Sequence, residues 1–222
     1  MARLILSLGE PGSGKSRAIM NLDPKTTVLI KPNYKELPFK GASKVFSTEN
    51  KNVAQKKTFL EVKEFLDKVN TKPEIKTVVI EDLSHYFNER VMKDAKITGF
   101  QKWTDLALDV FNSLIKAEES LRDDLTVIVI AHTERSSDVQ GNTIITLYTP
   151  GKLLENNIKI PSYFTYIIHT DVKEVNGKME YSFLTNTDGT RIAKSPEGCL
   201  EMYEPNDYKL ILEKIAKYQL GE

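Results

Sequence analysis

Residues 9–16 constrain this chain more than any other stretch, because Gly-Glu-Pro-Gly-Ser-Gly-Lys-Ser matches the phosphate-binding pattern G-x-x-x-x-G-K-[ST] at every fixed position. The apolar segment 4–8 before it predicts a buried strand, and residues 17–20 after it can begin a helix. Glycines let such a loop turn its backbone N–H groups inward around phosphate oxygens. The start of the following helix would add further N–H groups and a favourable dipole. The pattern therefore predicts a nucleotide-binding loop.

The same pattern assigns roles to single residues. Lys15 is expected to reach the β- and γ-phosphates, and the Ser16 hydroxyl is expected to ligate Mg²⁺. A glycine-rich turn that binds nothing and a site that binds nucleotide without hydrolysing it are the alternatives. The candidate cofactor-binding residues are Glu10, Pro11, Gly12, Ser13, Gly14, Lys15, Ser16 and Arg17.

Composition limits the class of protein. The chain has 222 residues and is 40% hydrophobic, which predicts a single domain over 1–222, with a core of about 1–135 and an extension of about 143–222. Lys and Arg together number 31, as do Asp and Glu, so a strongly basic nucleic-acid protein is not indicated, although a local basic patch stays open.

The sequence also indicates in which cellular compartment the protein is expected. Cys199 is the single cysteine, which excludes an internal disulfide and suits a reducing compartment. The first residues lead directly into the first expected strand, so no signal peptide is expected. The apolar runs are far shorter than the ~20 residues that a membrane span needs. We therefore expect a cytoplasmic protein without a membrane partner.

Alternating strand and helix patterns predict the fold. Strands are expected at 26–30, 77–80 and 125–131, helices at 52–70, 84–95 and 101–122, and a short extra strand at 44–47. In the last third, 143–148 is strand-like, 164–172 and 178–185 flank the hairpin signal Asn176-Gly177, and a helix begins near Asn206 or Asp207. The predicted fold is α/β, with a mainly parallel central sheet flanked by helices and extended by C-terminal antiparallel strands.

A second group of candidates follows the apolar strand 77–80. Glu81 and Asp82 stand at its end, where phosphate-loop proteins place an acid that holds Mg²⁺ and a neighbour that orients the attacking water. Both are therefore candidate catalytic and metal-binding residues, and the residues alone do not say which acid serves the metal. A solvated strand end is the structural alternative.

Three further side chains are candidates for the reaction itself. His132 follows the strand 125–131 and would face the γ-phosphate, although a purely structural histidine is the alternative. Arg135 and Lys152 are candidate fingers that stabilise charge on the nucleotide of a neighbouring subunit, with solvated loop residues as the alternative.

Segments along nearly the whole chain resemble the RecA-like phage ATP-binding proteins, often labelled AAA-type, which include the Sak-type single-strand annealing ATPases. The segments with the most specific likeness are Leu37-Pro38-Phe39-Lys40-Gly41 and Ala193-Lys194-Ser195-Pro196; the others are 9–16, 34–36, 78–82, 100–104, 121–125 with 131–132, 151–154 and 187–189. The resemblance implies a RecA-like P-loop NTPase that uses ATP and Mg²⁺, forms homo-oligomers and acts in phage DNA recombination or replication. Many members carry Asp at the position of Glu81, which implies that Glu81 is the metal acid.

Three functions remain open at this level. The first is an ATPase on single-stranded DNA, working with a phage single-strand-binding protein, with phosphate contacts from Lys51, Lys56, Lys57 and Lys63 and stacking from Tyr148, Tyr163 or Phe164. The second is a small-molecule or nucleotide kinase, which the absence of arginine from 136–142 disfavours. The third is a nucleotide-switched interaction protein without turnover.

Overall fold

The computed structural model describes residues 2–137, 140–151 and 153–221. Its centre is an eight-stranded sheet in the order β10-β9-β8-β1-β5-β4-β2-β3. Strands β8 to β3 in this order pair in parallel, whereas β9 and β10 join antiparallel at one edge. The bounds are β1 (Arg3–Leu8), β2 (Thr27–Lys31), β3 (Val53–Gln55), β4 (Thr77–Ile80), β5 (Thr126–Ala131), β8 (Tyr166–Val175), β9 (Lys178–Leu184) and β10 (Tyr203–Pro205). The expected fold class is therefore confirmed.

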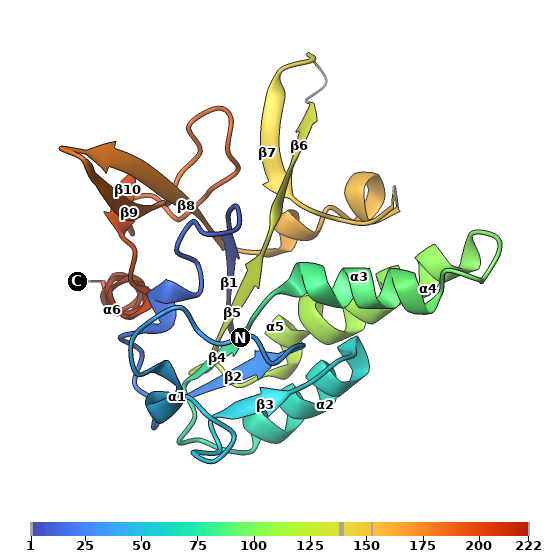
Figure 1. Cartoon of the computed structure of the whole chain (residues 1–222), viewed down its shortest axis with the longest axis horizontal. Helices are drawn as coiled ribbons and strands as arrows, with labels where there is room; N and C mark the ends of the chain where they lie inside the picture. Colours follow the sequence, from blue (N-terminus) through green and yellow to red (C-terminus); the bar gives the residue numbers. More distant parts are fainter. Residues whose placement is uncertain (1, 138–139, 152, 222) are drawn as a thin grey trace.

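Helices cover both faces of this sheet, as parallel strands require. One face carries α2, α3, α4 and α5, and the other carries α1 and α6 (Figure 1). The bounds are α1 (Ala42–Val45), α2 (Phe59–Asn70), α3 (Leu83–Lys93), α4 (Gln101–Val110), α5 (Ala117–Ser120) and α6 (Tyr208–Gln219). Because each central strand is covered twice, alternate residues of β1 enter different cores: Leu4 and Leu6 enter one, and Ile5 enters the other.

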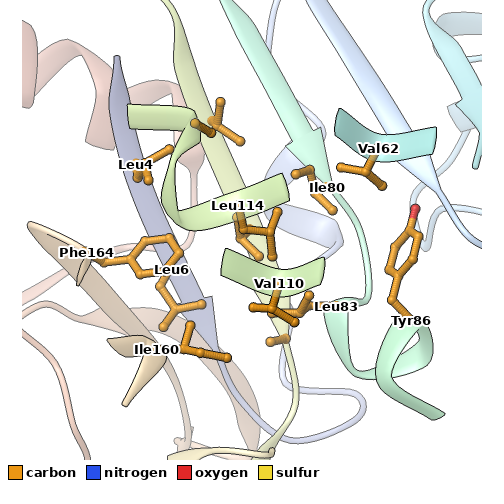
Figure 2. Close-up of a cluster of buried hydrophobic side chains, with 14 of the residues drawn as sticks. Leu4, Leu6, Val62, Ile80, Leu83, Tyr86, Val110, Leu114, Ile160 and Phe164 are labelled. Carbon is orange, nitrogen blue, oxygen red and sulfur yellow. The ribbon is translucent and has the colours of Figure 1, made fainter. Parts of the chain in front are cut away.

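The larger core holds the elements that carry the site. Figure 2 shows Leu4 and Leu6 of β1 beside Val110 and Leu114 of the long helical segment, with Ile160 and Phe164 closing one side. On the other side, Ile80 at the end of β4 and Leu83 at the start of α3 are both buried in the same cluster. The strand end that carries the two acids is thus fixed by apolar packing immediately before and after it.

The expected helix over 101–122 is interrupted. Between α4 and α5 lies a π-helical turn, η2 (Phe111–Ile115), in which the Lys116 N–H donates to the Phe111 carbonyl at 3.0 Å. The Ser113 hydroxyl donates to the carbonyl of Asp109 at 2.6 Å. The wider turn changes the phase of the buried stripe, so that Ser113, Leu114 and Ile115 are all buried. A π-helical turn holds one residue more than an α-helical turn, and sequence periodicity does not reveal that residue.

Two expectations at the edge of the sheet are wrong. The short strand expected at 44–47 is helical, because α1 occupies Ala42–Val45. The helix expected from residue 52 begins only at Phe59, where Thr58 and Glu61 form a capping box, and Val53–Gln55 forms β3 against β2. Pairing with a strand distant in sequence outweighs the local helical pattern here.

The expected strand at 143–148 forms, but it does not join the main sheet. Strand β7 (Thr143–Leu147) pairs antiparallel with β6 (Thr133–Ser137) in a separate two-stranded sheet. This hairpin projects from the end of β5, away from the helical layers (Figure 1). The sequence analysis expects a loop at Arg135 after the strand 125–131, so it does not predict β6.

The start of the phosphate loop is packed tightly against β8. A Cβ atom at Gly9 would lie 1.8 Å from Thr170 Oγ1 and 2.7 Å from Ser13 Oγ. The Thr170 hydroxyl is buried and reaches the Leu8 carbonyl at 3.2 Å and the Ser13 hydroxyl at 2.6 Å. A side chain at position 9 would therefore force the Thr170 hydroxyl out of its place.

We therefore predict that Gly9→Ala lowers the free energy of unfolding by about 1–3 kcal/mol, as overpacking typically does. Adding Thr170→Ala should recover part of that loss, because the atom that clashes is then absent. Urea unfolding of the two single variants and the double variant measures the coupling. Strictly additive effects would show that the Thr170 hydroxyl does not limit position 9.

Candidate functional site

The phosphate loop connects β1 to the 3-10 turn η1 (Arg17–Ile19). Gly14 has a φ of 97°, a backbone conformation that glycine adopts without the steric cost of a Cβ. The Ser13 hydroxyl donates to the Glu10 carbonyl at 2.6 Å, which closes the loop on itself. The helix expected after the loop is a single turn here. Its dipole therefore adds little, and the loop's own N–H groups are what remains to bind phosphate.

A cavity of about 470 Å³ opens over this loop. The carboxyl ends of β1, β4 and β5 all reach it, because β5 lies between β1 and β4 in the parallel sheet. The cavity walls include every loop residue from Pro11 to Arg17, together with Glu81, Asp82 and His132. The structure thus brings together residues from three strand ends that the sequence analysis treated as separate candidates.

Lys15 is the buried cation of the site, with 7% of its surface exposed. Its Nζ donates to the carbonyls of Gly9 at 2.6 Å and Glu10 at 2.7 Å. Burial lowers the pKa of Lys15 from its ordinary value to about 8, and the negative charges of Asp82 and Glu10 oppose part of that decrease. An ammonium that has already lost its water can bind phosphate oxygens without a further desolvation cost.

The two acids lie in different environments. Glu81 Oε2 is buried and has no hydrogen-bond partner among the described residues, and Lys31 Nζ lies 3.8 Å away. Asp82 is in the left-handed region with a φ of 61° and caps α3, where its carboxylate accepts from the His85 N–H at 3.2 Å. The cap holds Asp82 in place, while the buried oxygen of Glu81 accepts no hydrogen bond and has only the more distant Lys31 ammonium beside it.

His132 stands beside Asp82, with 3.7 Å between His132 Nε2 and Asp82 Oδ1. Its backbone N–H donates to the Ser84 hydroxyl at 2.9 Å, which fixes the end of β5 to the first turn of α3. Burial lowers the pKa of His132, and the charge of Lys15 acts in the same direction, whereas Asp82 opposes them. The neutral imidazole is therefore favoured at pH 7, where it can accept or donate a hydrogen bond at the cavity wall.

The donor set suits Mg²⁺ only in the company of a nucleotide. Among the residues that the structure describes, no group of three or more His, Cys, Asp or Glu side chains could hold a metal alone. Mg²⁺ commonly binds through one or two carboxylates plus substrate phosphates. The Glu81 oxygen that accepts no hydrogen bond and the Ser16 hydroxyl, which makes no capping hydrogen bond, fit that pattern.

The remaining candidate residues lie at the edge of the cavity or outside it. Arg17 is exposed at the cavity wall. The Glu10 side chain is turned to the start of β6, where the Thr133 hydroxyl donates to it at 2.9 Å. Arg135 is exposed on β6 and lies outside the cavity lining of its own chain, and Lys152 lies outside the described residues.

The sequence analysis missed one wall of the cavity. Asn33, Lys35, Glu36 and Pro38 follow the carboxyl end of β2, and Tyr181 comes from β9. The segment after β2 could have been suspected, because loops at the carboxyl ends of parallel strands form ligand crevices. Nothing in the local sequence around Tyr181 indicates a role in a site formed by residues 9–16.

No protein-family model matches the sequence. No curated protein matches it either. Among solved structures, the chain is similar to a KaiC-like protein from the hyperthermophilic archaeon Pyrococcus horikoshii OT3, at 17% identity over 90% of this chain and 83% of that chain, with a TM-score of 0.48. A likeness of this degree assigns no function.

The lowered pKa of Lys15 predicts a pH dependence of triphosphate binding. Below about pH 8 the amine carries its charge, and above it the charge is lost, so affinity for ATP should fall as the pH rises from 8 to 9.5. Calorimetric titration in two buffers of different ionisation enthalpy should also show net proton uptake on binding at pH 9. A Lys15→Arg variant stays charged throughout, and any binding it retains should lack both effects. A pH-independent affinity in the parent protein would contradict the assignment.

Proposed function

We propose that this protein is a Mg²⁺-dependent ATPase of the RecA-like P-loop class. The observation that carries the proposal is one cavity that gathers the phosphate loop, the desolvated Lys15 and the acids Glu81 and Asp82. A turn that binds nothing would not need a buried ammonium. The resemblance of residues 34–41 and 193–196 to phage ATP-binding proteins supports the class.

Each residue has a distinct task in this proposal. The loop N–H groups and Lys15 hold the β- and γ-phosphates, and the Ser16 hydroxyl with Glu81 holds the metal. Bound Mg²⁺ would neutralise charge on the phosphate oxygens. Asp82 orients the water that attacks the γ-phosphorus, and His132 is placed to hydrogen-bond within the same wall. The bond to the leaving ADP oxygen breaks as the bond to water forms, and the proton that the water gives up leaves with the inorganic phosphate.

At the biological level, the proposal is a homo-oligomer in the host-cell cytoplasm that acts in phage DNA recombination, single-strand annealing or replication. Single-stranded DNA and a phage single-strand-binding protein are the proposed partners. The family resemblance supports these points. None of the described helices combines the length and apolar character that crossing a bilayer requires.

Phosphate release is the experiment that tests the proposal. The protein is incubated with Mg²⁺-ATP alone, with single-stranded DNA, and with small phosphate acceptors. Release that DNA stimulates supports the ATPase, transfer to an acceptor supports a kinase, and tight binding without turnover supports a switch. Lys15→Ala is the control: loss of a charge-assisted contact should lower triphosphate affinity about tenfold to a hundredfold.

Substitutions of Glu81 and Asp82 should affect different properties of the reaction. Glu81→Gln should raise the Mg²⁺ concentration needed for half-maximal turnover, on the order of tenfold, because a metal ligand loses its charge. Asp82→Asn should keep the Mg²⁺ requirement and lower turnover roughly a hundredfold, because a neutral amide oxygen orients and activates the water less well than a carboxylate. Both variants should still bind ATP. Parent-like turnover in both would place the reaction elsewhere.

Activity should depend on assembly. Among the described residues, the cations at the cavity wall are Lys15, Arg17 and Lys35, whereas Arg135 stands on the projecting hairpin of β6 and β7 (Figure 1). We expect this hairpin to meet a neighbouring subunit. Turnover per subunit should rise with protein concentration, and Arg135→Ala or Lys152→Ala should lose turnover while binding ATP. A finger of this kind is worth ~10³ in rate.

Mixing variants provides the control. A Lys15→Ala subunit binds ATP weakly but carries intact fingers, so adding it to Arg135→Ala should restore part of the turnover. A rate independent of concentration, from a species shown to be monomeric by light scattering, would argue against a finger in trans.

A further inference from the structure

A second cavity, of about 880 Å³, lies at the end of the sheet opposite the phosphate loop. Thr27 begins β2 and lines this second cavity, whereas Lys31 ends the same strand beside Glu81 of the first cavity. Helices α1 and α2, which cover opposite faces of the sheet, both contribute to its walls (Figure 1). Among the described residues, the two cavities share no lining residue, so they are separate sites.

Lysine dominates the charge of this second cavity, which we call the lysine groove. One acid, Glu74, lines it, together with five exposed lysines: Lys25, Lys44, Lys51, Lys68 and Lys72. Within the described part of the chain, none of these five ammonium groups forms an ion pair, whereas Lys63 pairs with Asp67 at 2.8 Å and Lys214 pairs with Glu204 at 2.7 Å. The formal net charge of the chain is zero, so this excess of positive charge is local.

Buried polar contacts hold one wall of the groove in shape. Asn52 is 6% exposed, and its Nδ2 donates to the carbonyls of Pro24 at 3.2 Å and Val45 at 2.9 Å. The preceding Lys51 has a φ of 58°, in the left-handed region that a residue with a side chain seldom adopts, and its N–H donates to the Thr48 carbonyl at 3.1 Å. Strained residues of this kind are held by their surroundings and often mark binding sites.

One aromatic ring lies at the opposite wall. Phe65 is half-buried on α2 and lines the groove, and Lys68 follows it by three residues, on the same side of the helix. Lys56 Nζ lies 5.8 Å from the centroid of the Phe65 ring. A groove that combines cations with an aromatic ring is typical of single-strand binding, because the cations contact phosphates and the ring stacks on a base. In a duplex, the neighbouring bases cover the faces that would stack.

We propose that the lysine groove binds single-stranded DNA through its phosphate backbone. The inference deepens the proposed function, because it gives a place to the DNA partner proposed there. Lysine binds phosphate as a point charge, whereas arginine holds carboxylates in bidentate pairs, and no arginine is among the described residues that line the groove. The lining therefore favours phosphates over the carboxylates of an acidic peptide.

The location of the groove has two consequences. Because it is separate from the phosphate-loop cavity, DNA should bind without ATP. Of the lysines that the sequence suggested as phosphate contacts, the groove uses one, Lys51; the others, Lys56, Lys57 and Lys63, lie outside its lining.

Fluorescence anisotropy of a labelled single-stranded oligothymidylate, measured over a range of salt concentrations without nucleotide, tests the charges. Lys68→Gln/Lys72→Gln should weaken binding on the order of tenfold or more and reduce the slope of log K against log salt by about 1.4, because each phosphate contact of a single strand contributes ~0.7. Lys178→Gln/Lys217→Gln is the matched control. It removes two exposed lysines outside the groove, and Lys217 lies in the last turn of α6 as Lys68 lies in the last turn of α2.

A substitution of the ring tests stacking separately. Phe65→Leu keeps an apolar side chain without a π face, so it should weaken the oligothymidylate about fivefold or more and leave the salt slope unchanged. Thermal unfolding of each variant establishes that the fold is retained. Duplex DNA of the same length and polyglutamate are the competitors, and both should displace the oligothymidylate less well than unlabelled single strand does.

The outcomes are distinct. Equal weakening by the groove variant and the control variant, or no effect of either, would show that the lysine groove is not the DNA site. Displacement by duplex DNA or polyglutamate as effective as that by single strand overturns the assignment of a single-stranded ligand. The groove variant should hydrolyse ATP at the parent rate when DNA is absent. DNA binding by a parent protein that neither binds nor hydrolyses ATP would overturn the proposed function and leave the groove in place.

Discussion

The site depends on keeping the charge of Lys15 out of water. An ammonium in a largely buried position is expensive, and here it is stabilised only by two loop carbonyls and by the field of nearby acids. The lowered pKa of Lys15 reflects this cost of burial. Phosphate oxygens can replace the carbonyl partners, so the energy stored in desolvation becomes available for binding a triphosphate. The rest of the cavity is arranged around this one position.

Strand order brings the other charged groups to Lys15. Because β5 lies between β1 and β4, the loop and the acids stand one strand apart, and His132 ends the strand between them. The first turn of α3 then connects these ends: Asp82 caps it, and Ser84 receives the N–H of His132. Apolar packing of Ile80 and Leu83 on either side of the acids holds this connection rigid.

The C-terminal third supports the loop from the other side. Strand β8 pairs in parallel with β1, and its Thr170 hydroxyl fixes Ser13, while the buried Tyr208 of α6 donates to Ser7 at 2.8 Å. These contacts join residues more than 150 positions apart in the chain. The last third is therefore part of the structure that shapes the phosphate loop and supplies Tyr181 and Asn206 to its edge.

The sequence alone determined the parts governed by short-range rules. The spacing of glycines, Lys15 and Ser16 identifies the loop, the unbroken apolar run of β5 identifies a covered parallel strand, and Asn176-Gly177 identifies the hairpin. Tertiary structure decided what local patterns do not encode. Pairing at the sheet edge made β3 from residues expected to be helical, a π-helical turn interrupted the longest helix, and parallel pairing of β8 with β1 brought Tyr181 and Asn206 to Gly14. Contacts between residues far apart in sequence depend on strand order, which periodicity and spacing do not specify.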